Sequence, residues 1–280
     1  VKLLIEKFWP GPLTLLLPKL DAVPSVVTAG RKLVGVRMPA HPVALALIAA
    51  CNVPVAAPSA NRFGHTSSTT AQHVVDDLDG RIDMVLDAGP AWRGVESTVI
   101  EVRDRDTILY RPGAVAAEEI EAIVGPVVLY QPRNRGLHPT LAAQDAARMG
   151  HPQDLLPESL PSPGVDMRHY APNAKVIPVE MGENSEDGQA KWLQAIQTHS
   201  QTGNRVGVLL PTGWLLPEGF ASVRYAWGRW GDNDELARRL FAGLRELDAM
   251  GANFIVCPLP TDSGLGAAIR DRLLKAARAE

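Results

Sequence analysis

Residues 234–258 read DELARRLFAGLRELDAMGANFIVCP, and this stretch decides the fold of the C-terminal part of the chain. Its leucines recur at the spacing of one helix face: Leu236, Leu240, Leu244 and Leu247. This spacing predicts an amphipathic helix over residues 234–250, followed by a strand in the apolar run 254–258. A helix that leads directly into an apolar strand is typical of a parallel α/β sheet.

The segments around this stretch continue the same alternation. Strands are expected at 175–179, 205–210 and 223–227, and helices at 190–199 and 267–279. Residues 173–280 are therefore predicted to form a small parallel, Rossmann-like α/β domain.

Residues 1–130 combine more strands with fewer helices, in mixed order. Strands are expected at 13–17, 33–37, 53–57, 84–87, 97–102, 107–110 and 127–129, and helices at 43–50, 70–78 and 117–124. This pattern predicts a mixed, twisted sheet with helices. The chain starts with Val1 inside an amphipathic helix that has no cap, so we expect it to be a fragment with an incomplete N-terminal sheet.

Residues 131–172 are predicted to be a linker, because seven of the 42 are proline and the periodicity is lost. The segment ends in Arg168-His-Tyr-Ala-Pro172, which combines a cation, an imidazole and a phenol. A long connection of this kind is either a lid over a site or a docking segment between domains.

Composition excludes several classes of protein. The net charge is −3, and 46% of residues are hydrophobic, which is typical of a globular chain. No apolar run reaches the roughly 18–20 residues that a membrane span needs, and the N-terminus does not resemble a signal peptide. The 12 basic and 14 acidic residues of 1–130 argue against a coat for nucleic acid. Two distant cysteines, Cys51 and Cys257, favour a cytoplasmic protein without disulfides.

Polar side chains follow the apolar run 53–57, where Pro58 ends the expected buried strand. Ser59 and Asn61 would lie at the carboxyl end of that strand, the edge where α/β sheets bind ligands. The hydroxyls of residues 66–70 precede a helix, so at least one of them is expected to cap it, and Ser67 could both cap the helix and bind an anion at its N-terminus.

Two arginines end strands next to prolines, Arg37 and Arg111, and Ser97 begins another strand. A guanidinium carries forked donors that match phosphate and carboxylate. These side chains together predict a site for a small anionic ligand and a nucleotide. In the alternative, the arginines bind nearby carbonyls or Asp87.

Six motifs occur in order along the chain: FWPGPLT (8–14), VGVRMP (34–39), APSAN (57–61), GVESTV (94–99), LYRPG (109–113) and SPG…HYAP (162–172). Together they resemble the L-threonylcarbamoyladenylate synthase family in its long form, with a YrdC-like catalytic domain, a linker and a Rossmann-like domain. That family makes threonylcarbamoyl-AMP and pyrophosphate from L-threonine, bicarbonate and ATP. The product is used by the downstream machinery that attaches threonylcarbamoyl to adenosine in tRNA.

The resemblance also implies roles for individual residues. It assigns ATP contacts to Leu33, Ser59, Asn61, Ser67, Arg111, His169 and Tyr170. It assigns L-threonine contacts to Arg37, Ala57 and Ser97. The catalytic set would be Arg37, Ser59, Asn61 and Arg111, with Mg²⁺ bridging the phosphates. His169 and Tyr170 would close over the nucleotide from the linker.

One departure from the family is expected to matter. The family's Lys-x-Arg loop and the asparagine and histidine that follow it would all precede Phe8, and this sequence does not supply them. We therefore expect a chain that is truncated and weakly active or inactive. The alternative is a non-catalytic module that binds a nucleotide or double-stranded RNA. A carbamoyl-adenylate step within another carbamoyltransferase is a third hypothesis, and the linker and second domain argue against it.

Overall fold

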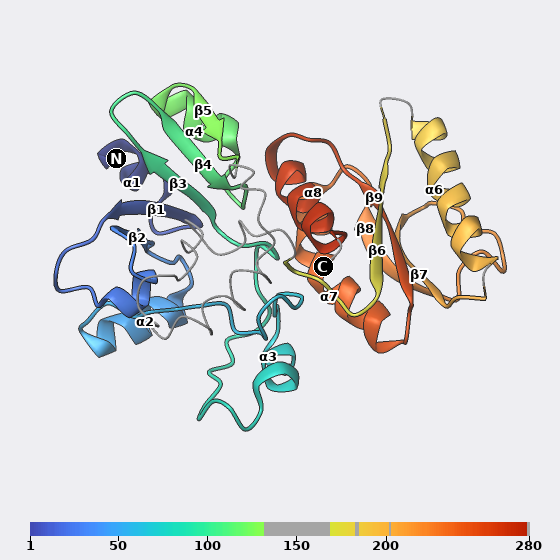
Figure 1. Ribbon diagram of the computed structural model, residues 1–280, viewed down its shortest axis with the longest axis horizontal. Coiled ribbons are helices and arrows are strands. Elements are labelled where there is room, and N and C mark those ends of the chain that lie inside the picture. The colour runs from blue at the N-terminus through green and yellow to red at the C-terminus, as the bar shows by residue number, and fades with distance from the viewer. Residues whose placement is uncertain (132–168, 183–184, 202, 279–280) are drawn as a thin grey trace, which may run out of the picture.

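The computed structural model describes residues 1–131, 169–182, 185–201 and 203–278. Two α/β domains lie side by side, and helices of the C-terminal domain face the N-terminal domain (Figure 1). Most of the predicted linker, including its use as a lid, lies outside the described residues.

The N-terminal domain contains a five-stranded sheet in the order β2-β1-β3-β4-β5. Its strands are β1 (Leu13–Pro18), β2 (Leu33–Val36), β3 (Thr98–Val102), β4 (Thr107–Arg111) and β5 (Val127–Leu129). The pairs β1–β2 and β3–β4 are antiparallel, whereas β1–β3 and β4–β5 are parallel. The predicted mixed sheet is therefore confirmed.

The helical segments of this domain are α1 (Lys2–Phe8), the 3-10 turn η1 (Ser25–Thr28), α2 (Pro42–Cys51), α3 (Ala71–Leu78) and α4 (Ala117–Val124). The core forms where α1 and α4 meet the sheet. Leu13 and Leu15 alternate along β1 and point to the same face, where they pack with Leu4 and Ile120. This periodicity of two in β1 is what places the core on that face.

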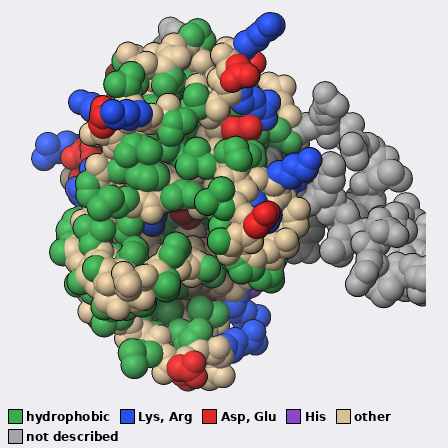
Figure 2. Space-filling model, turned by 90° about the vertical axis from the view of Figure 1, so that its left-hand side faces the viewer, with side chains coloured by type: hydrophobic (Ala, Val, Ile, Leu, Met, Phe, Trp, Pro, Cys, Tyr) green, Lys and Arg blue, Asp and Glu red, His purple; other side chains and the backbone are tan. Residues whose placement is uncertain are grey.

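Two predicted strands, 53–57 and 84–87, do not form. Val53 is 61% exposed, so the burial expected for 53–57 is also wrong, and Met84 is 81% exposed. An extended segment becomes a strand only when a neighbour accepts its backbone hydrogen bonds, and within the described residues no strand pairs with either segment. Hydrophobic side chains cover much of the face of this domain shown in Figure 2.

The C-terminal domain is a parallel sheet in the order β6-β9-β7-β8, as predicted. Its strands are β6 (Lys175–Glu180), β7 (Val206–Thr212), β8 (Val223–Arg229) and β9 (Phe254–Leu259). Its helices are α6 (Ser185–Ser200), α7 (Asn233–Ala249) and α8 (Gly264–Ala276). Helix α6 lies on the outer side of the sheet, and α7 and α8 lie on the side facing the N-terminal domain (Figure 1).

The predicted apolar face of α7 is the centre of this domain's core. Its four leucines are all fully buried: Leu236, Leu240, Leu244 and Leu247. Asp232 caps the helix by accepting a hydrogen bond from the Glu235 backbone N–H at 3.0 Å. With its apolar stripe turned to the sheet, α7 presents its polar residues to the N-terminal domain.

Within the described ranges, no helix is both long enough and apolar enough to cross a bilayer.

Candidate functional site

The central strands of the N-terminal sheet bring three polar side chains together. The Thr14 and Ser97 hydroxyl oxygens lie 2.7 Å apart, across the β1–β3 pair. Arg111, at the end of β4, donates from Nε to the Ser97 carbonyl and from Nη2 to the Ser97 hydroxyl, both at 3.1 Å. These contacts fix the plane of the Arg111 guanidinium. Arg111 therefore also behaves as the alternative hypothesis expected, because it binds a nearby backbone carbonyl.

Arg37 follows the end of β2 and lies near this group. Partial burial lowers the pKa of Arg37, and the charge of Arg111 lowers it further. An arginine still stays protonated at neutral pH. Two neighbouring guanidinium groups can hold an anion, and the anion site expected from the sequence stays a prediction.

A second polar chain links Ser67 to the C-terminal domain. The Ser67 hydroxyl donates to Glu96 Oε1 at 2.6 Å, and Arg272 Nε of helix α8 donates to Glu96 Oε2 at 2.7 Å. Arg272 has no exposed surface. Burial disfavours the Glu96 carboxylate, but the charges of Arg272 and Arg111 and the Ser67 hydroxyl outweigh burial and lower its pKa to about 2. Glu96 is therefore ionised at neutral pH.

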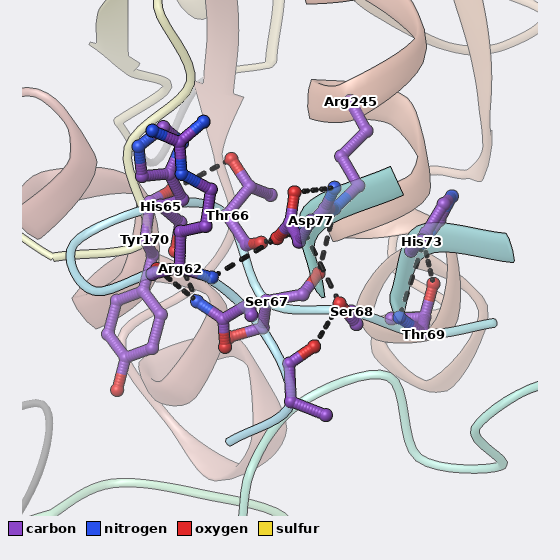
Figure 3. A network of polar contacts seen from close by, with 12 residues as sticks. Arg62, His65, Thr66, Ser67, Ser68, Thr69, His73, Asp77, Tyr170 and Arg245 are labelled. Carbon is purple, nitrogen blue, oxygen red and sulfur yellow. Dashed lines mark hydrogen bonds and ion pairs between the residues drawn. The ribbon is translucent and has the colours of Figure 1, made fainter. Parts of the chain in front are cut away.

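Arg245 of helix α7 binds the loop that carries Ser67 (Figure 3). It donates to Asp77 Oδ2 at 2.7 Å and to the Ser67 carbonyl at 3.3 Å, and it also donates to the Thr66 carbonyl. Burial raises the pKa of Asp77, but the hydrogen bonds and charge of Arg245 hold that pKa below its usual range. One side chain of the C-terminal domain thus ties the loop to helix α3.

His169 and Tyr170 lie against the same loop. The backbone N–H of Ala171 donates to the Gly64 carbonyl at 3.0 Å, and the Thr66 hydroxyl donates to the Tyr170 carbonyl at 3.4 Å. Tyr170 adopts a positive φ of 65°. The Arg272 guanidinium stacks over its ring, 4.9 Å from the centroid.

Four buried polar atoms of this region have no hydrogen-bond partner among the described residues: Asn61 Oδ1, His169 Nδ1, Tyr170 Oη and Arg272 Nη2. Burial lowers the pKa of His169 below its usual value, since it outweighs the opposing charge of Glu96. A neutral imidazole, a phenol and a guanidinium N–H are thus grouped between the domains. Buried polar groups normally have partners, so these atoms indicate a place for a polar ligand or water.

Of the other predicted residues, Ala57, Ser59 and Leu33 take no part in these networks, whereas Asn61 lies in the turn whose Arg62 N–H donates to Asp77. Ala57 and Ser59 are exposed in the irregular segment that replaces the expected strand, and Leu33 begins β2. Asn61 donates from Nδ2 to the carbonyls of Arg62 and His65 at 2.9 and 3.1 Å, which stabilises a turn. Helix α3 is capped by Thr70, which accepts from the His73 N–H at 3.2 Å. Ser67 is thus not the cap.

Sequence reasoning assigned no role to Thr14, Glu96, Arg245 or Arg272. Thr14 and Glu96 stand inside two of the six motifs, so they could have been singled out there. The two arginines stand on helices, where an arginine is normally taken for a solvated residue. Their partners lie more than 150 residues away in sequence, so periodicity carries no information about these contacts.

No group of three or more histidine, cysteine, aspartate or glutamate side chains suited to a metal occurs in the part of the chain that the structure describes. Asp77 and Glu96 are both paired with arginines. These residues do not fit a resident magnesium cage, which needs oxygen ligands in an octahedral arrangement.

The fold and the site thus define a two-domain α/β protein in which Arg37 and Arg111 lie close together at the N-terminal sheet. Residues 1–113 match the family described as "Telomere recombination", and residues 115–278 match "Threonylcarbamoyl-AMP synthase, C-terminal domain". The chain belongs to the threonylcarbamoyl-AMP synthase family, a family of enzymes. The resemblance seen in the six motifs is therefore confirmed.

Individual relatives agree with this assignment. Threonylcarbamoyl-AMP synthase of Bacillus subtilis is 41% identical over 99% of this chain and 72% of its own length. The enzyme of Pyrococcus abyssi is 38% identical over 98% of this chain and 73% of its own length. The crystal structure of P. abyssi Sua5 complexed with L-threonine superposes with a TM-score of 0.82 at 37% identity, covering 99% of this chain and 73% of that one.

The expectation of a truncated and weakly active chain gains no support from these comparisons, whose matches extend over nearly all of this sequence. In the structure, β5 belongs to the N-terminal sheet and α4 packs against it, although the second family match already begins at residue 115.

Proposed function

We propose that this chain makes threonylcarbamoyl-AMP and pyrophosphate from L-threonine, bicarbonate and ATP, for threonylcarbamoyl-adenosine formation in tRNA. The observation that carries the proposal is the juxtaposition of Arg37 and Arg111 beside Ser97. Two guanidinium groups and hydroxyls suit a carboxylate and a phosphate, which are the anionic groups of L-threonine and ATP. The relative solved with L-threonine supports the same assignment.

The reaction requires positioning and charge neutralisation rather than a covalent enzyme intermediate. The threonine amine bonds to the carbon of CO₂, which bicarbonate yields with loss of water, and forms a carbamate. A carbamate oxygen then bonds to the α-phosphorus of ATP, and the bond to the β-phosphate oxygen breaks to release pyrophosphate. Arg111, whose plane is set by Ser97, and Arg37 would neutralise the charge of the reacting groups.

The nucleotide would lie between Arg111 and the linker end. Ser67, Ser59, Asn61 and Leu33 are proposed ATP contacts, and Ala57 is proposed beside L-threonine. His169 and Tyr170 present the buried atoms that lack partners among the described residues, so they would cover the nucleotide. Mg²⁺ would enter with the ATP phosphates, since the described carboxylates do not form a cage for it.

The test is pyrophosphate release from ATP and bicarbonate with L-threonine, with L-serine and with no amino acid. We expect release that depends on L-threonine and falls at least about 100-fold in Arg111→Ala, since removal of a charged group at the reacting centre has effects of this size. Arg103→Ala is the matched control, because Arg103 pairs with Glu101 on the same strand pair and is half exposed.

A folded chain that binds ATP without threonine-dependent release would contradict the proposal. If such a chain retained double-stranded RNA in a salt-dependent way, it would be the binding module named as the alternative. We also propose a cytoplasmic location and transfer of the product to a downstream tRNA-modifying complex. Cys51 and Cys257 are free thiols, which supports a reducing compartment.

A further inference from the structure

The loop that carries Ser67 is bound by the C-terminal domain at both its backbone and its side chain. Arg245 donates to the Ser67 carbonyl, and the Ser67 hydroxyl donates to Glu96, which is paired with Arg272. Ser67 itself is only 7% exposed. The carbonyl and the hydroxyl of Ser67 are therefore both connected to arginines of the other domain, the first directly and the second through Glu96.

Arg245 holds the shape of this loop. Its guanidinium reaches the carbonyls of Thr66 and Ser67, the Ser68 hydroxyl at 3.4 Å and both oxygens of Asp77, as Figure 3 shows. Carbonyl groups that lose such a donor must find water or change conformation. Without Arg245, the Ser67 side chain would lose its fixed position relative to helix α3.

Arg272 differs from Arg245 in that it binds a single carboxylate of the N-terminal domain, Glu96, and neutralises its charge. The Glu96 side chain is 19% exposed and lies close enough to Arg111 for the charge of Arg111 to stabilise its carboxylate. Triphosphate is also proposed beside Arg111. A carboxylate without its partner would therefore repel the phosphates and weaken nucleotide binding.

We propose that the C-terminal domain is a working part of the nucleotide site, with Arg245 and Arg272 as positioning residues that set the geometry of Ser67 and the charge around it. This inference rests on the proposed function, because it takes ATP to be the ligand next to Ser67. It gives the Rossmann-like domain a role in the reaction: docking of this domain completes the ATP subsite of the N-terminal domain.

The experiment measures ATP affinity by titration calorimetry, together with the KM values for ATP and for L-threonine. For Arg245→Met and Arg272→Met we expect ATP binding to weaken about tenfold, which is the effect of one lost charge-assisted contact. The KM for L-threonine should change less than about twofold, because neither arginine contacts the Arg37 side of the site.

Matched controls exist on the same two helices. Arg239 of α7 donates to the Ala226 carbonyl at 2.9 Å, and Arg270 of α8 pairs with Glu180 at 2.6 Å, both inside the C-terminal domain. Arg239→Met and Arg270→Met should leave both KM values unchanged. Thermal unfolding of each variant separates a local effect on ATP from a loss of fold.

A charge rescue distinguishes neutralisation from packing. In the double variant Glu96→Gln/Arg272→Met, the unpaired carboxylate is gone, so ATP affinity should recover at least half of the loss seen with Arg272→Met alone. If Arg272→Met does not fold, this double variant and Arg245→Lys, which keeps the charge but not the forked donors, still give an answer. Arg245→Lys should retain part of the ATP affinity.

Wild-type ATP affinity and wild-type KM values in the Arg245 and Arg272 variants of an active chain would overturn the inference. Equal changes in the KM for ATP and for L-threonine would also overturn it, in favour of a general effect on domain structure. A wild-type chain that shows no threonine-dependent pyrophosphate release would instead overturn the proposed function, so the two failures can be told apart.

Discussion

The two domains differ in how their apolar residues are used. In the C-terminal domain, helices cover both faces of the parallel sheet, and α7 contributes a fully buried stripe of leucines. In the N-terminal domain, the described core lies mainly between the sheet and helices α1 and α4. The long segment 52–97 contains only helix α3 among its described residues until β3 begins, and many of its apolar side chains are exposed.

Because segment 52–97 has few regular elements and few buried apolar side chains, contacts with the C-terminal domain hold parts of it in place. Arg245 holds the loop before α3, and Arg272 pairs with Glu96. Gly94 approaches α7 so closely that a Cβ atom there would lie 2.2 Å from the Ala237 carbonyl oxygen. The C-terminal domain organises itself from local patterns, whereas part of the N-terminal domain is organised by contacts with its neighbour.

The largest contrast should come from apolar truncations. Leu244→Ala removes a fully buried side chain of α7, so it should lower the free energy of unfolding by about 2–5 kcal/mol. Val55→Ala, at a side chain that is 45% exposed in segment 52–97, should change it by less than about 0.5 kcal/mol. Urea unfolding of both variants measures this, and equal losses would show that the two domains do not differ in this way.

The buried ion pair between the domains should make stability depend on acid pH. The Glu96 pKa is lowered from 4.5 to about 2 in the folded chain, so its contribution is present in full above pH 4.5 and is lost as the pH falls towards 2. At 1.36 kcal/mol per unit this contribution is about 3 kcal/mol. Between pH 6 and pH 3, the free energy of unfolding should therefore decrease more in the wild type than in Glu96→Gln. Parallel pH profiles would refute the assignment to Glu96.

A comparison of alanine variants at two glycines distinguishes the cost of a left-handed backbone from the cost of a steric clash between the domains. Gly94 and Gly89 have φ values of 71° and 85°, but a Cβ atom at Gly89 would have no heavy atom of the described residues within 4 Å. Gly89→Ala should cost only about 1 kcal/mol from the left-handed backbone. Gly94→Ala should cost about 1–3 kcal/mol more, because the methyl group meets α7. Calorimetric unfolding checks both, and equal costs would mean that α7 can move aside freely.

The smallest effect should come from an exposed ion pair in the N-terminal sheet. Arg103 donates to Glu101 at 2.7 Å, but its side chain is 50% exposed. Arg103→Ala should lower the free energy of unfolding by less than about 1 kcal/mol, and added salt should reduce the difference. If Arg103→Ala lowered the free energy of unfolding as much as loss of the Glu96–Arg272 pair, the exposed and the buried ion pair would not differ as proposed. Urea unfolding at low and high salt provides the measurement.

Prediction from sequence worked where partners lie close in the chain or where a pattern repeats. The leucine spacing of α7 and the short apolar run of β1 led to the correct elements because both signals depend on residues close together in the chain. The apolar runs 53–57 and 84–87 have strand composition and yet remain irregular. Composition is not sufficient there, because a strand also needs a neighbouring strand, which is a non-local condition.

The candidate site shows the same division. Arg111 and Ser97 were predicted from motifs and Ser67 from the hydroxyls that precede a helix, and the structure joins each of them to a hydrogen-bond network. Ser59 and Asn61 were predicted from the end of a strand that does not form, so their assignment to ATP stays a proposal.

By itself the sequence determined the family and the mixed and parallel sheets, because motifs and periodicity depend on residues close in the chain. Only the tertiary structure decided that Arg245 and Arg272 of the C-terminal domain support Ser67 and Glu96. The physical reason is that a guanidinium can pair with any carboxylate or carbonyl it reaches. Which one it reaches depends on how two folded domains pack, and no local pattern encodes that.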